Sequence, residues 1–377
     1  MTRMTQPGLY IHVPFCEKKC AYCNFYSVTT LSDIPAYVKA ILEEISLYAN
    51  DYDKFDTIYV GGGTPSLLTA AAFSEILLHV RTTFTIDPGA EITVEANPAD
   101  VHPHFLTSLR QAGVNRLNLG VQSFDEGVLR FLERRHTSGQ ALQGMAQARA
   151  AGFDHIGLDL IYGIPGQTPL SWKDTLSRAL SFEPEHLSCY ELSLEGDTPL
   201  GHRHRQGHFK LPDDDGAADL FMMTSDILEE AGYRHYEVSN FARTDRFKSR
   251  HNQKYWRHVP YLGLGPAAHS FCGQKRWWNH RSLNQYLSDI RQHRRPVADS
   301  EQLTPSQARL EACFLGLRTR EGVPVGSLSE PCGAPSRPEK EEILNHLIRQ
   351  GFIVVQDGFI KPTRRGLAVA DRLALLL

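Results

Sequence analysis

Short apolar and β-branched runs alternate with longer amphipathic stretches over the first 200 residues, and no other feature of the sequence constrains the fold as strongly. The short runs predict strands at residues 9–13, 57–60, 91–95, 116–121, 155–161 and 186–192. Helical patterns separate them, as at residues 35–48, 70–82 and 139–150. Strands that alternate with helices form parallel βα units. The sequence therefore predicts an α/β fold around a parallel sheet.

Glycines and polar groups follow directly after these predicted strands. The first strand leads into a cysteine-rich loop, and the next four end at Gly61-Gly62-Gly63-Thr64-Pro65, Glu95, Gln122 and Asp159. Parallel βα barrels and doubly wound sheets both collect their functional groups at the carboxyl ends of the strands. We therefore expect one site at this edge, whichever of the two architectures forms.

The loop after the first strand has the spacing C-x-x-x-C-x-x-C, formed by Cys16, Cys20 and Cys23. Three thiolates can bind three irons of a 4Fe-4S cubane and leave the fourth iron open. A zinc site and three unrelated cysteines are the alternatives. The remaining cysteines are scattered, and the odd total of seven suits a metal site in a reducing compartment better than a disulfide framework. They are Cys189, Cys272, Cys313 and Cys332.

Five further motifs accompany the cysteines: Y-I-H-V-P-F-C, G-G-G-T-P-S, V-E-A-N-P, G-V-Q-S-F and D-L-I-Y-G-I-P-G-Q-T. With them the sequence resembles the radical SAM superfamily, and within it the oxygen-independent coproporphyrinogen III oxidase family. This resemblance implies a partial (β/α)6 barrel, a 4Fe-4S cluster on the three loop cysteines, and S-adenosylmethionine (SAM) at the open iron, where reductive cleavage of its sulfonium starts the chemistry. By position in the motifs, the implied cofactor contacts are Tyr10, Gly62, Gly63, Thr64, Glu95, Gln122, Arg134 and Asp159.

Two features depart from the oxidase pattern. That pattern continues to a further cysteine where this chain has Phe25, and it begins with a longer extension than the 15 residues that precede Cys16. The segment from His251 to Trp256 reads H-N-Q-K-Y-W, and this H-N-x-x-Y-W pattern resembles the mark of the HemW group of heme chaperones. The expected function is therefore heme delivery. The alternatives are oxidative decarboxylation of coproporphyrinogen III and radical SAM chemistry on another substrate.

The resemblance to heme chaperones also implies heme as a bound group. An imidazole beside a tyrosine and a tryptophan can hold heme, which makes His251 a candidate axial ligand, while a packed structural histidine is the alternative. The implied partners are acceptor hemoproteins, respiratory enzymes among them, and an electron donor such as flavodoxin or ferredoxin.

The rest of the chain predicts two further regions after a barrel at residues 1–235. Residues 236–300 are expected to be an irregular, aromatic-rich connection that carries the H-N-x-x-Y-W segment. Residues 301–377 are expected to form a winged-helix-like domain, with helices at 305–317 and 338–350, a hairpin at 352–361 turning at Asp357-Gly358, and a closing helix from Arg364. A structural cap is favoured over DNA binding for this domain.

The charge balance argues against a nucleic-acid partner. The formal net charge is −3, with 22% charged and 41% apolar residues, as in an ordinary globular surface. No signal-peptide h-region and no run of about 18 apolar residues occurs, so a cytoplasmic location is expected, and peripheral membrane contact stays open.

Overall fold

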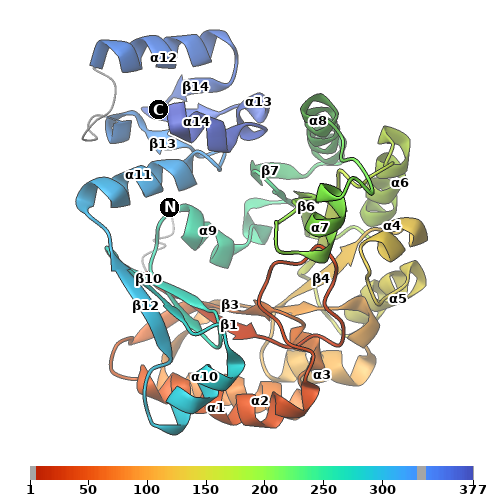
Figure 1. Cartoon of the computed structure of the whole chain (residues 1–377), viewed down its shortest axis with the longest axis vertical. Helices are drawn as coiled ribbons and strands as arrows, with labels where there is room; N and C mark the ends of the chain where they lie inside the picture. The colour runs from red at the N-terminus through yellow and green to blue at the C-terminus, as the bar shows by residue number, and fades with distance from the viewer. Residues whose placement is uncertain (1–5, 329–336, 377) are drawn as a thin grey trace.

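The computed structural model describes residues 6–328 and 337–376, and Cys332 lies outside these ranges. A large mixed sheet forms the body of the molecule, and a small three-stranded sheet belongs to the C-terminal part (Figure 1). The large sheet has the order β12-β11-β10-β9-β1-β2-β3-β4-β5-β6-β8-β7.

The middle of the large sheet consists of six parallel strands in chain order. They are β1 (Gly8–Val13), β2 (Lys54–Gly62), β3 (Thr85–Ala96), β4 (Arg116–Gln122), β5 (Ile156–Tyr162) and β6 (His186–Glu191). The helices between them are α1 (Ile34–Leu47), α2 (Ala70–Thr83), α3 (Pro103–Gln111), α4 (Glu126–Phe131), α5 (Ser138–Ala150) and α6 (Pro169–Leu180). Every strand and helix predicted in this part of the chain overlaps an observed one. The predicted partial (β/α)6 barrel is confirmed.

The two faces of the sheet follow the alternation of side chains along each strand. On β4, Leu117, Leu119 and Val121 are fully buried in the main core. The intervening residue Asn118 points the other way and donates to Asp159 on β5. Because successive side chains of a strand point to opposite faces, apolar residues pack under the helices while polar residues gather inside the barrel.

Residues 234–300 are not irregular, so that expectation was wrong. They contain β7 (Arg234–Glu237), β8 (Asn240–Ala242), α9 (Arg250–Trp256), β9 (Tyr261–Leu264), β10 (His269–Cys272), β11 (Lys275–Asn279), α10 (Leu283–Arg291) and β12 (Val297–Gln302). Strand β9 pairs parallel with β1, and β8 pairs antiparallel with β6, so this region extends the barrel sheet at both edges. Most of these strands have three to five residues, which is too short for a period to appear, and the pairings that join them to the barrel, β9 with β1 and β8 with β6, connect segments far apart in the chain.

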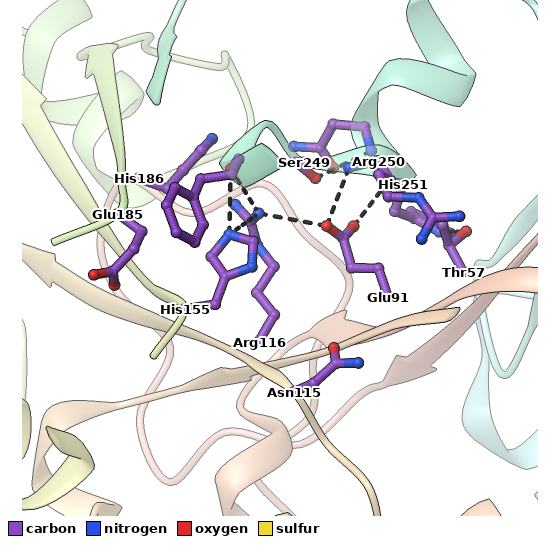
Figure 2. A network of polar contacts seen from close by, with 12 residues as sticks. Thr57, Glu91, Asn115, Arg116, His155, Glu185, His186, Ser249, Arg250 and His251 are labelled. Carbon is purple, nitrogen blue, oxygen red and sulfur yellow. Dashed lines mark hydrogen bonds and ion pairs between the residues drawn. The ribbon is translucent and has the colours of Figure 1, made fainter. Parts of the chain in front are cut away.

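Helix α9 lies against the amino-terminal end of the parallel strands, opposite to the end that carries the cysteine loop. The Glu91 carboxylate accepts hydrogen bonds from the backbone N–H groups of Arg250 (3.2 Å) and His251 (3.0 Å), which are the first two residues of the helix. Figure 2 shows Glu91 pointing to this helix start with Arg116 beside it. The ion pair between Arg116 and Glu91 (3.5 Å) is almost completely buried, with side-chain exposures of 2% and 5%. A carboxylate is therefore the anchor of α9.

Replacement of this anchor, Glu91→Gln, is expected to lower the free energy of unfolding by about 3 to 5 kcal/mol, because it leaves the buried Arg116 guanidinium without its carboxylate. Urea denaturation at pH 7 measures the loss. The matched control is Glu321→Gln, which breaks a half-exposed pair with Arg257 (2.6 Å) and should cost less than about 1 kcal/mol. Equal losses in the two variants would contradict the role assigned to Glu91.

The chain continues after β6 with α7 (Pro199–Arg205) and α8 (Asp214–Glu230). The C-terminal part then contains α11 (Pro305–Gly316), β13 (Val323–Pro324), α12 (Arg337–Arg349), β14 (Ile353–Gln356), β15 (Phe359–Pro362), α13 (Arg364–Leu367) and α14 (Ala370–Leu376). Asp357 and Gly358 have φ values of 54° and 79°, as a tight hairpin turn between β14 and β15 requires. The predicted winged-helix-like arrangement is confirmed, while the domain boundaries at residues 235 and 300 stay a prediction.

Among helices of the described residues, none has the length and apolar character needed to cross a bilayer.

Candidate functional site

The three loop cysteines lie on the connection between β1 and α1, at the carboxyl end of the strands. The loop is anchored by Phe15, which is fully buried and packs edge-on against Tyr37 with ring centroids 5.4 Å apart. Backbone hydrogen bonds add to this: Cys16 N donates to Val28 O (3.0 Å), and Leu200 N donates to Ala21 O (2.9 Å). Cys16, Cys20 and Cys23 are partly exposed and form no disulfide. A firmly packed loop thus presents three free thiols.

Polar groups of the barrel contact these sulfur atoms. Thr64 Oγ1 donates to Cys16 Sγ (3.4 Å), and Arg134 Nη1 donates to Cys20 Sγ (3.5 Å). Burial raises the pKa of the Cys23 thiol, and the proximity of Cys20 and Cys16 raises it further. Hydrogen bonds to the sulfur atoms that bind a 4Fe-4S cluster are one of the factors that set its reduction potential.

No group of three His, Cys, Asp or Glu side chains within residues 6–328 and 337–376 is drawn together as around a single metal ion. A cubane does not require such a group, because each thiolate binds its own iron.

Beside the thiols lies a pocket of about 590 Å³. Its walls come from the carboxyl ends of β2 to β6. Of the residues implied by the resemblance, it is lined by Cys23, Gly62, Gly63, Thr64, Glu95, Gln122, Arg134 and Asp159. The lining also includes Tyr190 and Glu191 at the end of β6, which the sequence analysis missed. The strand-end rule that selected the other positions applies equally to this sixth strand and could have found them.

The glycine loop leaves no room for side chains. Gly62 has a φ of +109°, and a Cβ there would lie 2.5 Å from the His12 ring. A Cβ on Gly63 would lie 2.6 Å from the Phe15 carbonyl oxygen, in the cysteine loop. The glycines therefore let the second strand end directly against the cysteine loop.

Gln122 also has a strained backbone. Its φ is 66°, a value that side-chain-bearing residues rarely adopt, and the pairing of β4 with β5 slips between Gly120 and Gln122. Strain of this kind persists only where the surroundings enforce it, and it concentrates at functional sites.

Two partly exposed carboxyl groups face the pocket. Glu95 accepts hydrogen bonds from Tyr59 Oη (2.6 Å) and Gly62 N (3.2 Å), and burial, with a smaller contribution from the charge of Asp159, raises its pKa to about 7. Burial also raises the pKa of Asp159, whose Oδ2 accepts from Asn118 (2.6 Å). The other oxygen, Asp159 Oδ1, has no hydrogen-bond partner.

The cation of the pocket is Arg134. Its Nη2 donates to Gly120 O (2.7 Å), while its buried Nε has no hydrogen-bond partner. Unpartnered buried polar atoms are rare in folded proteins, and here they indicate space for a polar ligand. Carboxylates that accept from an amino group or ribose hydroxyls, together with an arginine that can pair with a carboxylate, suit the charges of SAM. The residues present therefore fit the cluster and the cofactor.

Of the expected contacts to SAM and heme, two do not line the pocket. Tyr10 lies deeper in the barrel, and its hydroxyl hydrogen-bonds to His12 Nδ1 (2.9 Å). His251 is 1% exposed, with its Nδ1 2.9 Å from Thr57 Oγ1 and its Nε2 2.9 Å from Tyr255 Oη. In this arrangement neither ring nitrogen of His251 is open to an iron atom, and axial ligation by His251 stays a prediction.

Comparisons with known proteins agree with this geometry. Residues 10–179 match the family model described as the radical SAM superfamily, and residues 303–369 match the HemN C-terminal domain. The chain is similar to "Heme chaperone HemW" of Mycobacterium tuberculosis, with 37% identity over 97% of this chain and 93% of the relative. It is also similar to "Heme chaperone HemW" of Lactococcus lactis, with 34% identity over 96% of this chain and 94% of the relative.

A solved structure is similar over nearly the whole fold. It is that of the coproporphyrinogen III oxidase HemN from Escherichia coli, described as a radical SAM enzyme, with a TM-score of 0.84 and 25% identity. The similarity covers 98% of this chain and 90% of that chain.

Proposed function

Since the chain belongs to the HemW family of heme chaperones, a branch of the radical SAM proteins related to coproporphyrinogen III oxidase, we propose that it binds heme and delivers it to acceptor hemoproteins. We also propose that it carries a 4Fe-4S cluster on Cys16, Cys20 and Cys23 and binds SAM beside it. The observation that carries the proposal is the similarity to named heme chaperones over almost the entire length of both proteins.

The pocket supports the cofactor part of this proposal. Glu95 and Asp159 would accept hydrogen bonds from cationic or hydroxyl groups of SAM, and Arg134 would pair with its carboxylate. When bound, the cluster supplies an electron and SAM supplies a sulfonium that this electron can cleave. The chain itself would orient the cofactor through these three side chains, and burial raises the pKa of both carboxyl groups.

The second candidate function is the decarboxylation of coproporphyrinogen III, which the similarity to HemN favours. The residue that argues against it is Phe25, which stands where the oxidase pattern has a further cysteine. Phe25 lies at the cofactor pocket with 66% of its surface exposed. A large apolar side chain at this position offers no ligand and no proton-transfer group.

One experiment separates the two functions. Anaerobically reconstituted protein is titrated with hemin and, in parallel, assayed for decarboxylation of coproporphyrinogen III with SAM and a reductant such as reduced flavodoxin. We expect stable heme uptake, transfer of that heme to a heme-free acceptor, and no decarboxylation. Rapid decarboxylation, or no heme uptake at all, would contradict the chaperone function.

A further inference from the structure

Two stacked rings inside the barrel, those of Tyr59 and His251, form an aromatic line that connects the cofactor pocket with α9. At one end, Tyr59 Oη donates to Glu95 Oε1 over 2.6 Å. At the other end, the ring of Tyr59 stacks on that of His251, with centroids 5.2 Å apart and an interplanar angle of 30°. Tyr59 therefore contacts both the carboxylate that lines the pocket and the histidine of the H-N-x-x-Y-W segment.

His251 is held from both sides. Thr57 Oγ1 and Tyr255 Oη each lie 2.9 Å from one of its ring nitrogens. Burial, and then the charge of Lys254, lowers the pKa of His251 to about 3, so the ring is neutral at physiological pH. A neutral imidazole has one N–H donor and one acceptor nitrogen, and the two hydroxyl groups occupy both.

The helix that carries His251 is itself fixed. Glu91 binds the first two N–H groups of α9, as Figure 2 shows. On the side of β1, a Cβ built at Gly8 would come within 3.0 Å of His251 Cε1 and 2.8 Å of Lys254 Cδ, so β1 packs closely against the helix. The imidazole ring on which Tyr59 stacks is thus held in place by the contacts of α9 with Glu91 and β1.

We infer that Tyr59 and His251 are positioning residues of the cofactor site, which hold the Glu95 carboxylate in the orientation that SAM requires. The inference rests on the proposed binding of SAM. The H-N-x-x-Y-W segment then lies beneath the cofactor pocket, where its histidine supports Tyr59. In this role His251 does not bind heme iron.

The physical reason lies in the two oxygens of Glu95. Oε2 accepts from Gly62 N at 3.2 Å, which is a weak contact, while Oε1 accepts the much shorter bond from Tyr59. Without the Tyr59 hydroxyl, the carboxylate can rotate about its terminal torsion, which is intrinsically broad for glutamate. In metal sites, removal of the outer partner that orients a ligand typically costs about 10-fold to 100-fold in affinity, and we expect a loss at the lower end of that range for a cofactor-binding carboxylate.

Calorimetric titration of the reconstituted full chain with SAM tests the inference. We expect Tyr59→Phe to raise the Kd for SAM about 10-fold, and His251→Phe, which keeps a stacking ring but loses both hydrogen bonds, to raise it about 3-fold. Iron and sulfide content of each variant should stay near the wild type, and the Tm of His251→Phe should fall, because the buried Thr57 hydroxyl loses its partner. Absence of SAM binding by the wild type would overturn the proposed function along with this inference. Binding by the wild type with an unchanged Kd in Tyr59→Phe would overturn this inference alone.

A double-mutant cycle distinguishes positioning from a general structural role. If Tyr59 acts through Glu95, the variant Tyr59→Phe/Glu95→Gln should bind SAM no more weakly than Glu95→Gln alone. Losses of SAM affinity that add would show that Tyr59 does not act through Glu95 and would overturn the inference.

The matched control is Tyr286→Phe. Tyr286 Oη donates to Glu44 over 2.7 Å, and burial raises the pKa of the Glu44 carboxyl to about 7, as for Glu95. Glu44 does not line the cofactor pocket, so this variant should keep the wild-type Kd.

Hemin titration of His251→Phe addresses the competing role of the same residue. We expect His251→Phe to keep the heme affinity and the Soret band of the wild type. Loss of heme binding with an unchanged Kd for SAM would overturn the inference and assign His251 to heme.

Discussion

Serine at position 16, 20 or 23 is expected to abolish the broad charge-transfer absorption of the reconstituted cluster. The single variants Cys16→Ser, Cys20→Ser and Cys23→Ser each remove the thiolate that would bind one iron, and a hydroxyl is a poor replacement for it. The loop itself should stay folded, since its anchors are Phe15 and backbone hydrogen bonds to Val28 and Ala21, none of which involves a cysteine side chain. Ultraviolet-visible spectra together with iron and sulfide analysis measure the loss.

The controls are cysteines away from the loop. Cys189 is buried in β6 and Cys272 is exposed at the end of β10, so Cys189→Ala and Cys272→Ser should both retain a full cluster. The same is expected for Cys313 and for Cys332, which lies outside the described residues. Iron and sulfide content near the wild-type value in any of the three loop variants would overturn the ligand assignment.

The second large effect concerns the glycine loop: Gly62→Val is expected to abolish measurable SAM binding while the cluster still assembles. The φ of +109° is strained for any residue with a Cβ, and this Cβ would lie 2.5 Å from the His12 ring. Relief of the clash must move the Gly62 N–H, which binds Glu95. The carboxylate and the pocket wall would then be displaced together. Calorimetry with SAM and cluster analysis of the same sample provide the two readouts.

A matched glycine separates local strain from loss of the site. Gly152 also has a positive φ, +84°, and nothing lies within 4 Å of a Cβ placed there. Gly152→Val should therefore lower the Tm through backbone strain but keep the affinity for SAM. Unchanged SAM affinity in Gly62→Val would place the cofactor elsewhere.

Prediction from the sequence worked best where the signal is local. The parallel strands and their helices were predicted from apolar periodicity, and two of these helices are followed by Gly113 and Gly152, with the positive φ values of +89° and +84° that suit a helix end. The hairpin turn at Asp357-Gly358 was equally clear, because its backbone requires positive φ at both positions. By contrast, the strands between residues 234 and 302 were missed. A strand of three or four residues, such as β8 or β9, carries too little pattern to be recognised without its partner.

What the sequence by itself determined is the chemistry at the strand ends: three thiols at cluster spacing, a glycine loop, and polar groups after successive strands. Parallel pairing brings such ends together whatever the details of packing. The tertiary structure alone decided the surroundings of His251, since its partner Thr57 lies 194 residues away and the stacking ring of Tyr59 comes from the same distant strand. A motif shows which side chains are present. Which of these side chains are buried, and which groups they bond to, depends on how the curved sheet and the short helix pack. A local sequence pattern does not contain that information.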